Sequence, residues 1–138
     1  MRGRTVANMA DWDEVRRLAL ELPDTTEAVS WGSAHWRVHD KGFVWERPLR
    51  KKELVHLGLV EQEEPVLGAR VDDEATKLAL LEEDADVFLT TPHFVDFPAI
   101  LVWLDRIQQR RLEELVVEAW FAVAPPKLAS RWLADHPD

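Results

Sequence analysis

The segment from residue 87 to residue 104 constrains the fold of this chain more than any other part of it. Two short apolar runs, residues 87–89 and 99–104, flank a stretch with two prolines, a histidine and two phenylalanines. Apolar runs of this length that are bounded by proline are typical of buried strands joined by a turn. We therefore expect two strands of one sheet, with polar and aromatic side chains of the intervening turn at the surface.

The other elements follow from the spacing of apolar residues. Alternation over residues 33–39 predicts a strand, and Gly42 is expected to supply the positive backbone angle of a tight turn into a second strand at 43–47. A third strand is expected at 65–71, and residues 24–32 are interpreted as a polar connection. Steps of three and four residues predict helices at 11–22, 72–83, 112–123 and 126–133.

Two details of these helices depend on single patterns. The helix at 72–83 is expected to bury a stripe made by Ala75, Leu78, Ala79 and Leu81. After Pro48, a short helix with Leu54 and Leu57 on its buried side, closed by Gly58, is expected; the alternative is a strand over residues 54–60.

This order of elements leaves few ways to build a parallel crossover sheet, because consecutive strands are mostly joined by short connections. The sequence predicts an α+β fold in which a single antiparallel sheet of about five strands has its helices packed on one face. The 138 residues suffice for one domain, which we place at residues 11–138 after a flexible N-terminal extension, residues 1–10.

Composition excludes several classes of function. The chain has no cysteine, which excludes disulfides, thiolate zinc sites and cysteine catalysis. No apolar run approaches the roughly 18 residues of a membrane span, and the N-terminus lacks the apolar core of a secretion signal, so we expect a cytoplasmic location and no membrane partner. His35 and His39 lie about 13 Å apart on the expected strand, too far for one metal ion. No metal or cofactor is expected.

A small basic group stands out against an acidic chain. The net charge of −9 disfavours binding to a polyanion, but four basic side chains fall within six residues: Arg47, Arg50, Lys51 and Lys52. They are candidate nucleic-acid or anion contacts, because each neutralised phosphate adds a salt-sensitive contribution to affinity. The alternative is an ordinary solvated loop.

The turn between the last two strands holds the second candidate site. Thr90, Thr91, His93 and Phe94 are candidate ligand or partner contacts. A catalytic interpretation would use His93 as acid or base with Thr91 or Asp96 orienting it, whereas a structural interpretation has the hydroxyls bonding nearby backbone. The seven tryptophans are expected mostly in the core, with Trp31 and Trp36 as candidates for exposure.

Several blocks resemble one known family. They are Trp-Gly-Ser-Ala-His-Trp-Arg-Val at 31–38, Lys-Gly-Phe-Val-Trp at 41–45, Thr-Thr-Pro-His-Phe at 90–94, Phe-Pro-Ala-Ile-Leu-Val-Trp-Leu-Asp at 97–105 and Glu-Ala-Trp-Phe-Ala-Val-Ala-Pro at 118–125. Together they resemble the MmcQ/YjbR-like family. The resemblance implies a frataxin-like (CyaY-like) α+β fold and a DNA-binding role that the family carries largely by analogy of fold. It transfers no catalytic residue, and Trp103 replaces a residue that is often basic in relatives.

From these observations we expect a non-enzymatic binding domain that holds nucleic acid weakly through its basic and aromatic surface. A protein-interaction module with an unidentified protein partner is the first alternative. A small-molecule or catalytic site around the Thr-Thr-Pro-His turn is the second.

Overall fold

The structure is a computed structural model and describes residues 10–137. The helices in this part of the chain are α1 (Trp12–Leu20), α2 (Lys51–Leu57), α3 (Glu74–Glu83), α4 (Gln109–Val123) and α5 (Pro126–Asp135), with a 3-10 helix at Pro92–Phe94. The strands are β1 (Thr25–Ser30), β2 (Ser33–Val38), β3 (Lys41–Glu46), β4 (Val66–Arg70), β5 (Phe88–Leu89) and β6 (Ala99–Trp103).

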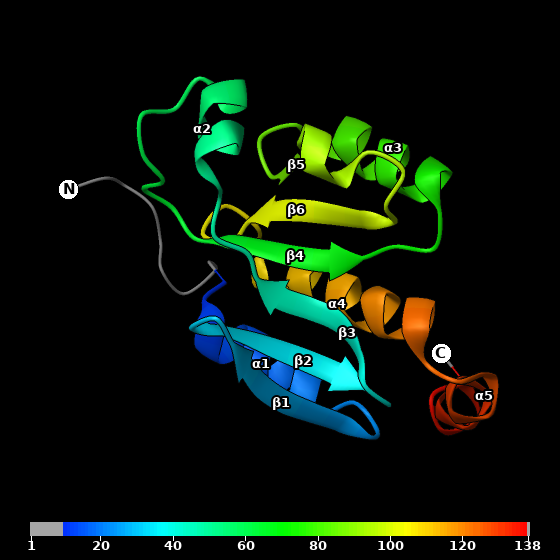
Figure 1. Ribbon diagram of the computed structural model, residues 1–138. Helices are drawn as coiled ribbons and strands as arrows, with labels where there is room; N and C mark the ends of the chain where they lie inside the picture. The colour runs from blue at the N-terminus through cyan, green and yellow to red at the C-terminus, as the bar shows by residue number, and fades with distance from the viewer. Residues whose placement is uncertain (1–9, 138) are drawn as a thin grey trace.

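The strands form one antiparallel sheet in the order β1-β2-β3-β4-β6-β5 (Figure 1). This confirms the predicted α+β class with a single antiparallel sheet. The helices do not all pack on one face, as was expected, because α2 packs on the face opposite α1 and α4. The interpretation of residues 24–32 as a connection was wrong, because Thr25–Ser30 pairs along its whole length with β2. β1 is an edge strand with four half-exposed or exposed polar residues, so it lacks the apolar alternation that marks a half-buried strand.

Two tight turns join the first three strands. Trp31 and Gly32 have φ values of 54° and 79°, and His39 and Asp40 have φ values of 49° and 69°. Two successive positive φ values are typical of two-residue hairpin turns, whose twist matches that of the strands. The expectation that Gly42 supplies the positive angle was wrong: His39 and Asp40 make the turn, and Gly42 lies inside β3.

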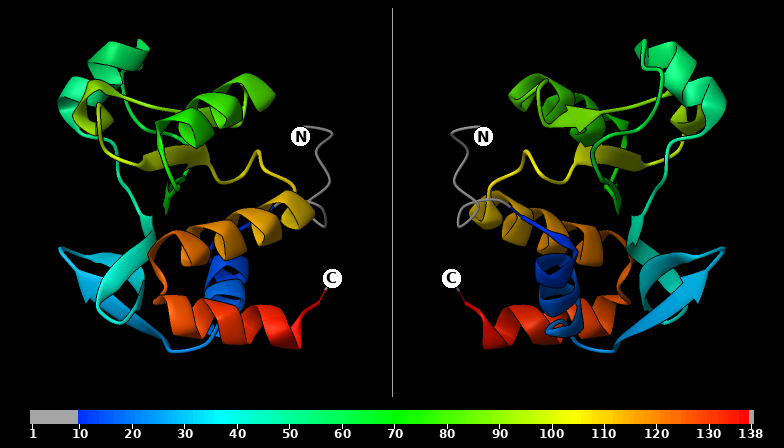
Figure 2. Two further views of the ribbon diagram at one scale, coloured as in Figure 1. Left: turned by 90° about the vertical axis from the view of Figure 1, so that its right-hand side faces the viewer. Right: turned by 90° about the vertical axis from the view of Figure 1, so that its left-hand side faces the viewer.

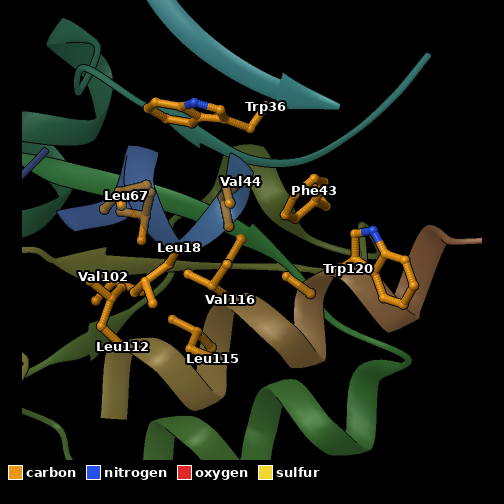
Figure 3. Packing of buried hydrophobic residues seen from close by; sticks show 14 of the residues in the cluster. Leu18, Trp36, Phe43, Val44, Leu67, Val102, Leu112, Leu115, Val116 and Trp120 are labelled. Atoms are coloured by element: carbon orange, nitrogen blue, oxygen red, sulfur yellow. The ribbon is translucent and has the colours of Figure 1, made fainter. Parts of the chain in front are cut away.

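The main core lies between one face of the sheet and helices α1 and α4. Leu112, Leu115, Val116 and Trp120 line the buried side of α4, as their spacing of three and four residues predicted. They meet Leu67, Val102, Val44 and Phe43 from the sheet and Leu18 from α1 (Figure 3). Burial of a large apolar side chain is worth about 1.5–3 kcal/mol, so this interface is the main source of stability.

A smaller core lies on the opposite face of the same strands. Leu67 and Val102 belong to the main core, whereas their neighbours Val66 and Leu101 belong to the second cluster. The second cluster is closed by Leu54 and Leu57 of α2 and by Phe94. The short helix α2 is therefore confirmed over the strand alternative, and Gly58 ends it with φ 74°. Figure 2 shows α2 and α3 at the β5–β6 end of the molecule, away from α1, α4 and α5.

Helix α3 presents a different side to the core than predicted. Its buried residues are Lys77 and Leu80, while Ala75, Leu78 and Ala79 are exposed. The helix packs beside β5 at the edge of the sheet, and of the predicted stripe only Leu81, which is half-buried, packs against the core. The stripe predicted from alanine and leucine spacing was wrong.

At the N-terminus, the predicted extension falls mostly on residues 1–9, which lie outside the described residues. Ala10 is buried in the main core, and its amide donates to the carbonyl of Ile107 at 3.3 Å. The packed part of the chain therefore includes Ala10. Within residues 10–137, no helix combines the length and apolar character needed to cross a bilayer.

Candidate functional site

Three segments meet on the second face of the sheet: the end of β3, the start of α2 that follows it, and the turn after β5, which is about forty residues further along the chain. One carboxylate joins them. Glu53 accepts two hydrogen bonds from the guanidinium of Arg47, from Nη1 to Oε1 and from Nη2 to Oε2, both at 2.9 Å. The hydroxyl of Thr91 donates to Oε2 at 2.6 Å, and the amide of Arg50 donates to Oε1 at 2.9 Å.

This cluster of Arg47, Glu53 and Thr91, called here the Glu53 network, is buried. Arg47, Glu53 and Thr91 are only 8%, 4% and 2% exposed, respectively. Burial alone would raise the pKa of Glu53, but the hydrogen bonds from Thr91, the Arg50 amide and Arg47 outweigh it and hold that pKa below its ordinary value. Glu53 is therefore ionised at neutral pH and fixes α2 against the turn.

Arg47 is consequently not a surface contact. Its guanidinium is used inside the protein, where it also stands 5.0 Å from the centre of the Phe94 ring. The prediction of Arg47 as an anion contact was wrong, because its guanidinium is buried and pairs with Glu53. Of the basic group, Arg50, Lys51 and Lys52 remain exposed.

The Thr-Thr-Pro-His turn is held in place by buried side chains and hydrogen bonds. Phe94 is 5% exposed and packs in the second cluster, so its expected surface role was wrong. The ammonium of Lys77, itself 2% exposed, donates to the carbonyl of Phe94 at 2.7 Å. Thr90 is half-buried, and Thr91 is committed to Glu53. Of the predicted loop set, His93 alone is exposed.

His93 and the basic side chains share a cavity. Arg50, Lys51, Lys52, Glu53, Pro92 and His93 line a space of about 570 Å³ between the start of α2 and the 3-10 helix. The structure thus brings together two candidate sets that lie about forty residues apart in sequence. His93 makes no hydrogen bond to Thr91 or Asp96 within the described residues, so the expected catalytic pairing is not formed.

Beside this basic cavity lies an aromatic groove on the uncovered part of the sheet. It has a volume of about 440 Å³ and is lined by side chains of β1–β3 and of the segment leading to α2, among them Trp31, His35, Trp45 and Arg50. Arg50 belongs to both spaces, so the basic cavity and the aromatic groove adjoin.

The two indoles of the groove are held differently. The indole of Trp45 lies against Gly68 of β4, where a Cβ would collide with the ring, so this position favours glycine. Trp31 is 100% exposed at the tip of the β1–β2 turn. Burial, together with the nearby Arg37, lowers the pKa of His35 despite Glu46, so the imidazole in the groove is neutral at pH 7.

Sequence reasoning missed Glu53 and Lys77. One available signal was the position of Glu53, three residues after Arg50. An acidic residue there can accept a hydrogen bond from the amide of the residue that precedes the helix, as Glu53 does from Arg50. Lys77 offered a weaker signal, because it precedes Leu80 and Leu81 at helical spacing. Among residues 10–137, no group of three or more histidine or acidic side chains has an arrangement that would hold a metal ion.

Comparison with known proteins agrees with this architecture. The family model described as YjbR matches residues 20–122. The uncharacterized protein Rv2570 of Mycobacterium tuberculosis is 44% identical over 130 residues, which are 92% of this chain and 98% of the relative, and the uncharacterized protein Mb2600 of Mycobacterium bovis matches equally.

A solved structure shows the same fold. The crystal structure of Deinococcus radiodurans protein DR2400, a DUF419 domain, superposes with a TM-score of 0.61 at 19% identity and covers 83% of this chain and 79% of that one. The Thr90–Phe94 block, the buried α4 stripe and the antiparallel sheet lie within the region that the family model matches. The chain therefore belongs to the YjbR family.

Proposed function

We propose that this protein is a non-enzymatic binding domain that holds nucleic acid through the basic cavity and the aromatic groove beside it. The observation that carries the proposal is that Arg50 lines both spaces. Phosphate groups would lie against Arg50, Lys51 and Lys52, and a base would reach the indoles of the groove.

Charge sets the strength of such binding. Three exposed cations give a modest electrostatic contribution, and the net charge of −9 opposes close approach of a long polyanion. For three phosphate contacts on a single strand, log Kd should change with log salt by a slope of about 2, from roughly 0.7 per contact. The proposal is thus weak, salt-sensitive binding with a short footprint.

The test is a titration of labelled DNA at two salt concentrations, followed by fluorescence anisotropy. The variant Arg50→Gln, Lys51→Gln, Lys52→Gln should abolish the salt-dependent binding. Its matched control is Arg110→Gln, Lys127→Gln, Arg131→Gln, which makes the same charge change at three exposed positions on α4 and α5. Equal loss in both variants, or no binding at low salt, would contradict the proposal.

A small anionic molecule is a second candidate, favoured by His93 on the wall of the basic cavity. Cavities of a few hundred cubic ångströms are typical of small-ligand sites. In that case inorganic phosphate or a nucleoside monophosphate would compete with DNA, and His93→Ala would weaken the small ligand more than the DNA.

A further inference from the structure

The aromatic groove has features that the binding of phosphate alone does not require. Its lining includes the indole of Trp45, which lies against Gly68, and the fully exposed indole of Trp31. The indole of Trp31 is 100% exposed, so its faces are accessible to a ligand that enters the groove.

The groove carries hydrogen-bonding groups without formal charge at its rim. Ser30, Ser33 and His35 line the groove together with the two indoles, and His35, neutral at pH 7, lies opposite Trp45 in the β2–β3 pairing. One carboxylate oxygen of Glu46 already has a hydrogen-bond partner, because its Oε1 accepts from the amide of Ala34 at 2.7 Å. The lining thus combines two indoles and uncharged polar groups with the charged side chains of Glu46 and Arg50, and indoles beside hydrogen-bonding groups suit a heterocyclic base.

From this arrangement we infer that the protein prefers single-stranded over double-stranded nucleic acid, with an unpaired base in the aromatic groove and the adjoining phosphates in the basic cavity. This inference rests on the proposed function and specifies its ligand. In a duplex the faces of the bases are hidden by their neighbours, so indoles can stack only on bases that are unpaired.

The charge distribution points the same way. Only Arg50, Lys51 and Lys52 of the basic group are free to meet phosphates, and a duplex presents a denser array of charge than a single strand to a chain that is itself acidic. Stacking supplies affinity that does not depend on salt, which compensates for the few cations. Arg50, at the junction, would meet the phosphate next to the stacked base.

Trp31 allows a clean test, because its side chain contacts nothing in the fold. In Trp31→Asn the indole is removed, and asparagine tolerates the left-handed conformation that the turn requires. The unfolding midpoint should not change. The matched control is Val60→Asn, which removes a side chain that is 98% exposed and lines neither the groove nor the cavity.

The probes are a labelled oligothymidylate of about 12 nucleotides, within the site sizes of single-stranded-DNA-binding domains, and a duplex of the same length. We expect the single strand to bind at least about fivefold tighter than the duplex. Trp31→Asn should weaken the single strand about fivefold or more and leave the duplex unchanged, as expected for the loss of one stacking contact.

The variant Arg50→Gln separates the two proposals. It should weaken both probes and reduce the salt slope for the single strand by about 0.7. If the two probes bind equally and Trp31→Asn has no effect while Arg50→Gln still weakens both, the single-strand inference is overturned and the proposed function stands. If neither probe shows salt-dependent binding, both proposals are overturned. A partner that depends on Trp31 but not on Arg50, such as a protein, would also overturn the inference.

Discussion

The two faces of the sheet are stabilised by different kinds of interaction. On the face covered by α1 and α4, Leu115, Trp120 and their neighbours exclude water over a continuous apolar interface (Figure 3). On the face covered by α2, a small apolar cluster is joined to the Glu53 network and to the buried ammonium of Lys77. The apolar interface depends on area and shape, whereas the second face depends on whether each buried charge keeps its partner.

The largest expected effect is on the charged face. Glu53→Gln leaves the buried guanidinium of Arg47 without its counter-charge, so it should lower the free energy of unfolding by about 3–5 kcal/mol. Urea denaturation measures this. The double variant Arg47→Met, Glu53→Leu should lose less than Glu53→Gln alone, because it removes both charges. A loss below about 1 kcal/mol for Glu53→Gln would show that the network does not stabilise α2.

The apolar face should respond through a cavity. Leu115 is 1% exposed, and Leu115→Ala is expected to lower the free energy of unfolding by about 3 kcal/mol, within the range of large-to-small core substitutions. The same urea experiment applies. The distinguishing result is the partial recovery given by Leu115→Met, which restores volume without any polar group. No such recovery would contradict the view that area and shape control this face.

A third variant probes the place where a strand passes beneath the groove. Gly68→Ala sets a methyl group against the indole of Trp45, and an overpacked site of this kind is expected to lose about 1–3 kcal/mol. The near-ultraviolet circular dichroism of the indole should change with it. Gly42→Ala is the control, since a Cβ there meets open space. Equal effects of the two alanines would show that the close approach is unimportant.

The smallest effect is expected from pH. The pKa of Glu53 is lowered in the folded state, so its contribution to stability is complete above the ordinary value of 4.5 and is lost as pH falls through the folded value. Stability of the wild type should decline below about pH 4.5 more steeply than that of Glu53→Gln. Urea midpoints measured from pH 7 down to pH 3 provide the comparison. Parallel curves would remove Glu53 as a source of acid sensitivity.

The contrast between the faces also explains what the sequence predicted. Helix α4 and strand β2 follow from periodicity, because a face that buries area must repeat apolar residues at the period of its element. Strand β1 was missed because an edge strand needs no such repeat. The family resemblance was confirmed, and the blocks that carried it lie mostly on the strands and on α4.

The exposed residues of the candidate site were predicted from the sequence, but their arrangement around one cavity was not. The exposed residues Arg50, Lys51, Lys52 and His93 were named in advance, and the structure places them around one cavity. Arg47 and Phe94 were assigned to the surface because charge and turn composition alone do not show burial. Glu53 pairs with Arg47 six residues away across the bend between β3 and α2, and Lys77 bonds Phe94 17 residues away. Neither pair falls at the spacing of a helix or strand, so the periodicity of apolar residues carries no information about it.

The bond between Thr91 and Glu53 joins segments 38 residues apart and has a consequence for ligand binding. The cavity walls come from both sides of that bond, so the cavity exists only when α2 and the turn after β5 have come together. A ligand that fits the cavity would then bind the native state alone, and at ten times its dissociation constant it would add about 1.4 kcal/mol to the resistance against unfolding. A rise in the melting temperature of the protein would therefore report ligand binding in the cavity, whatever the ligand is.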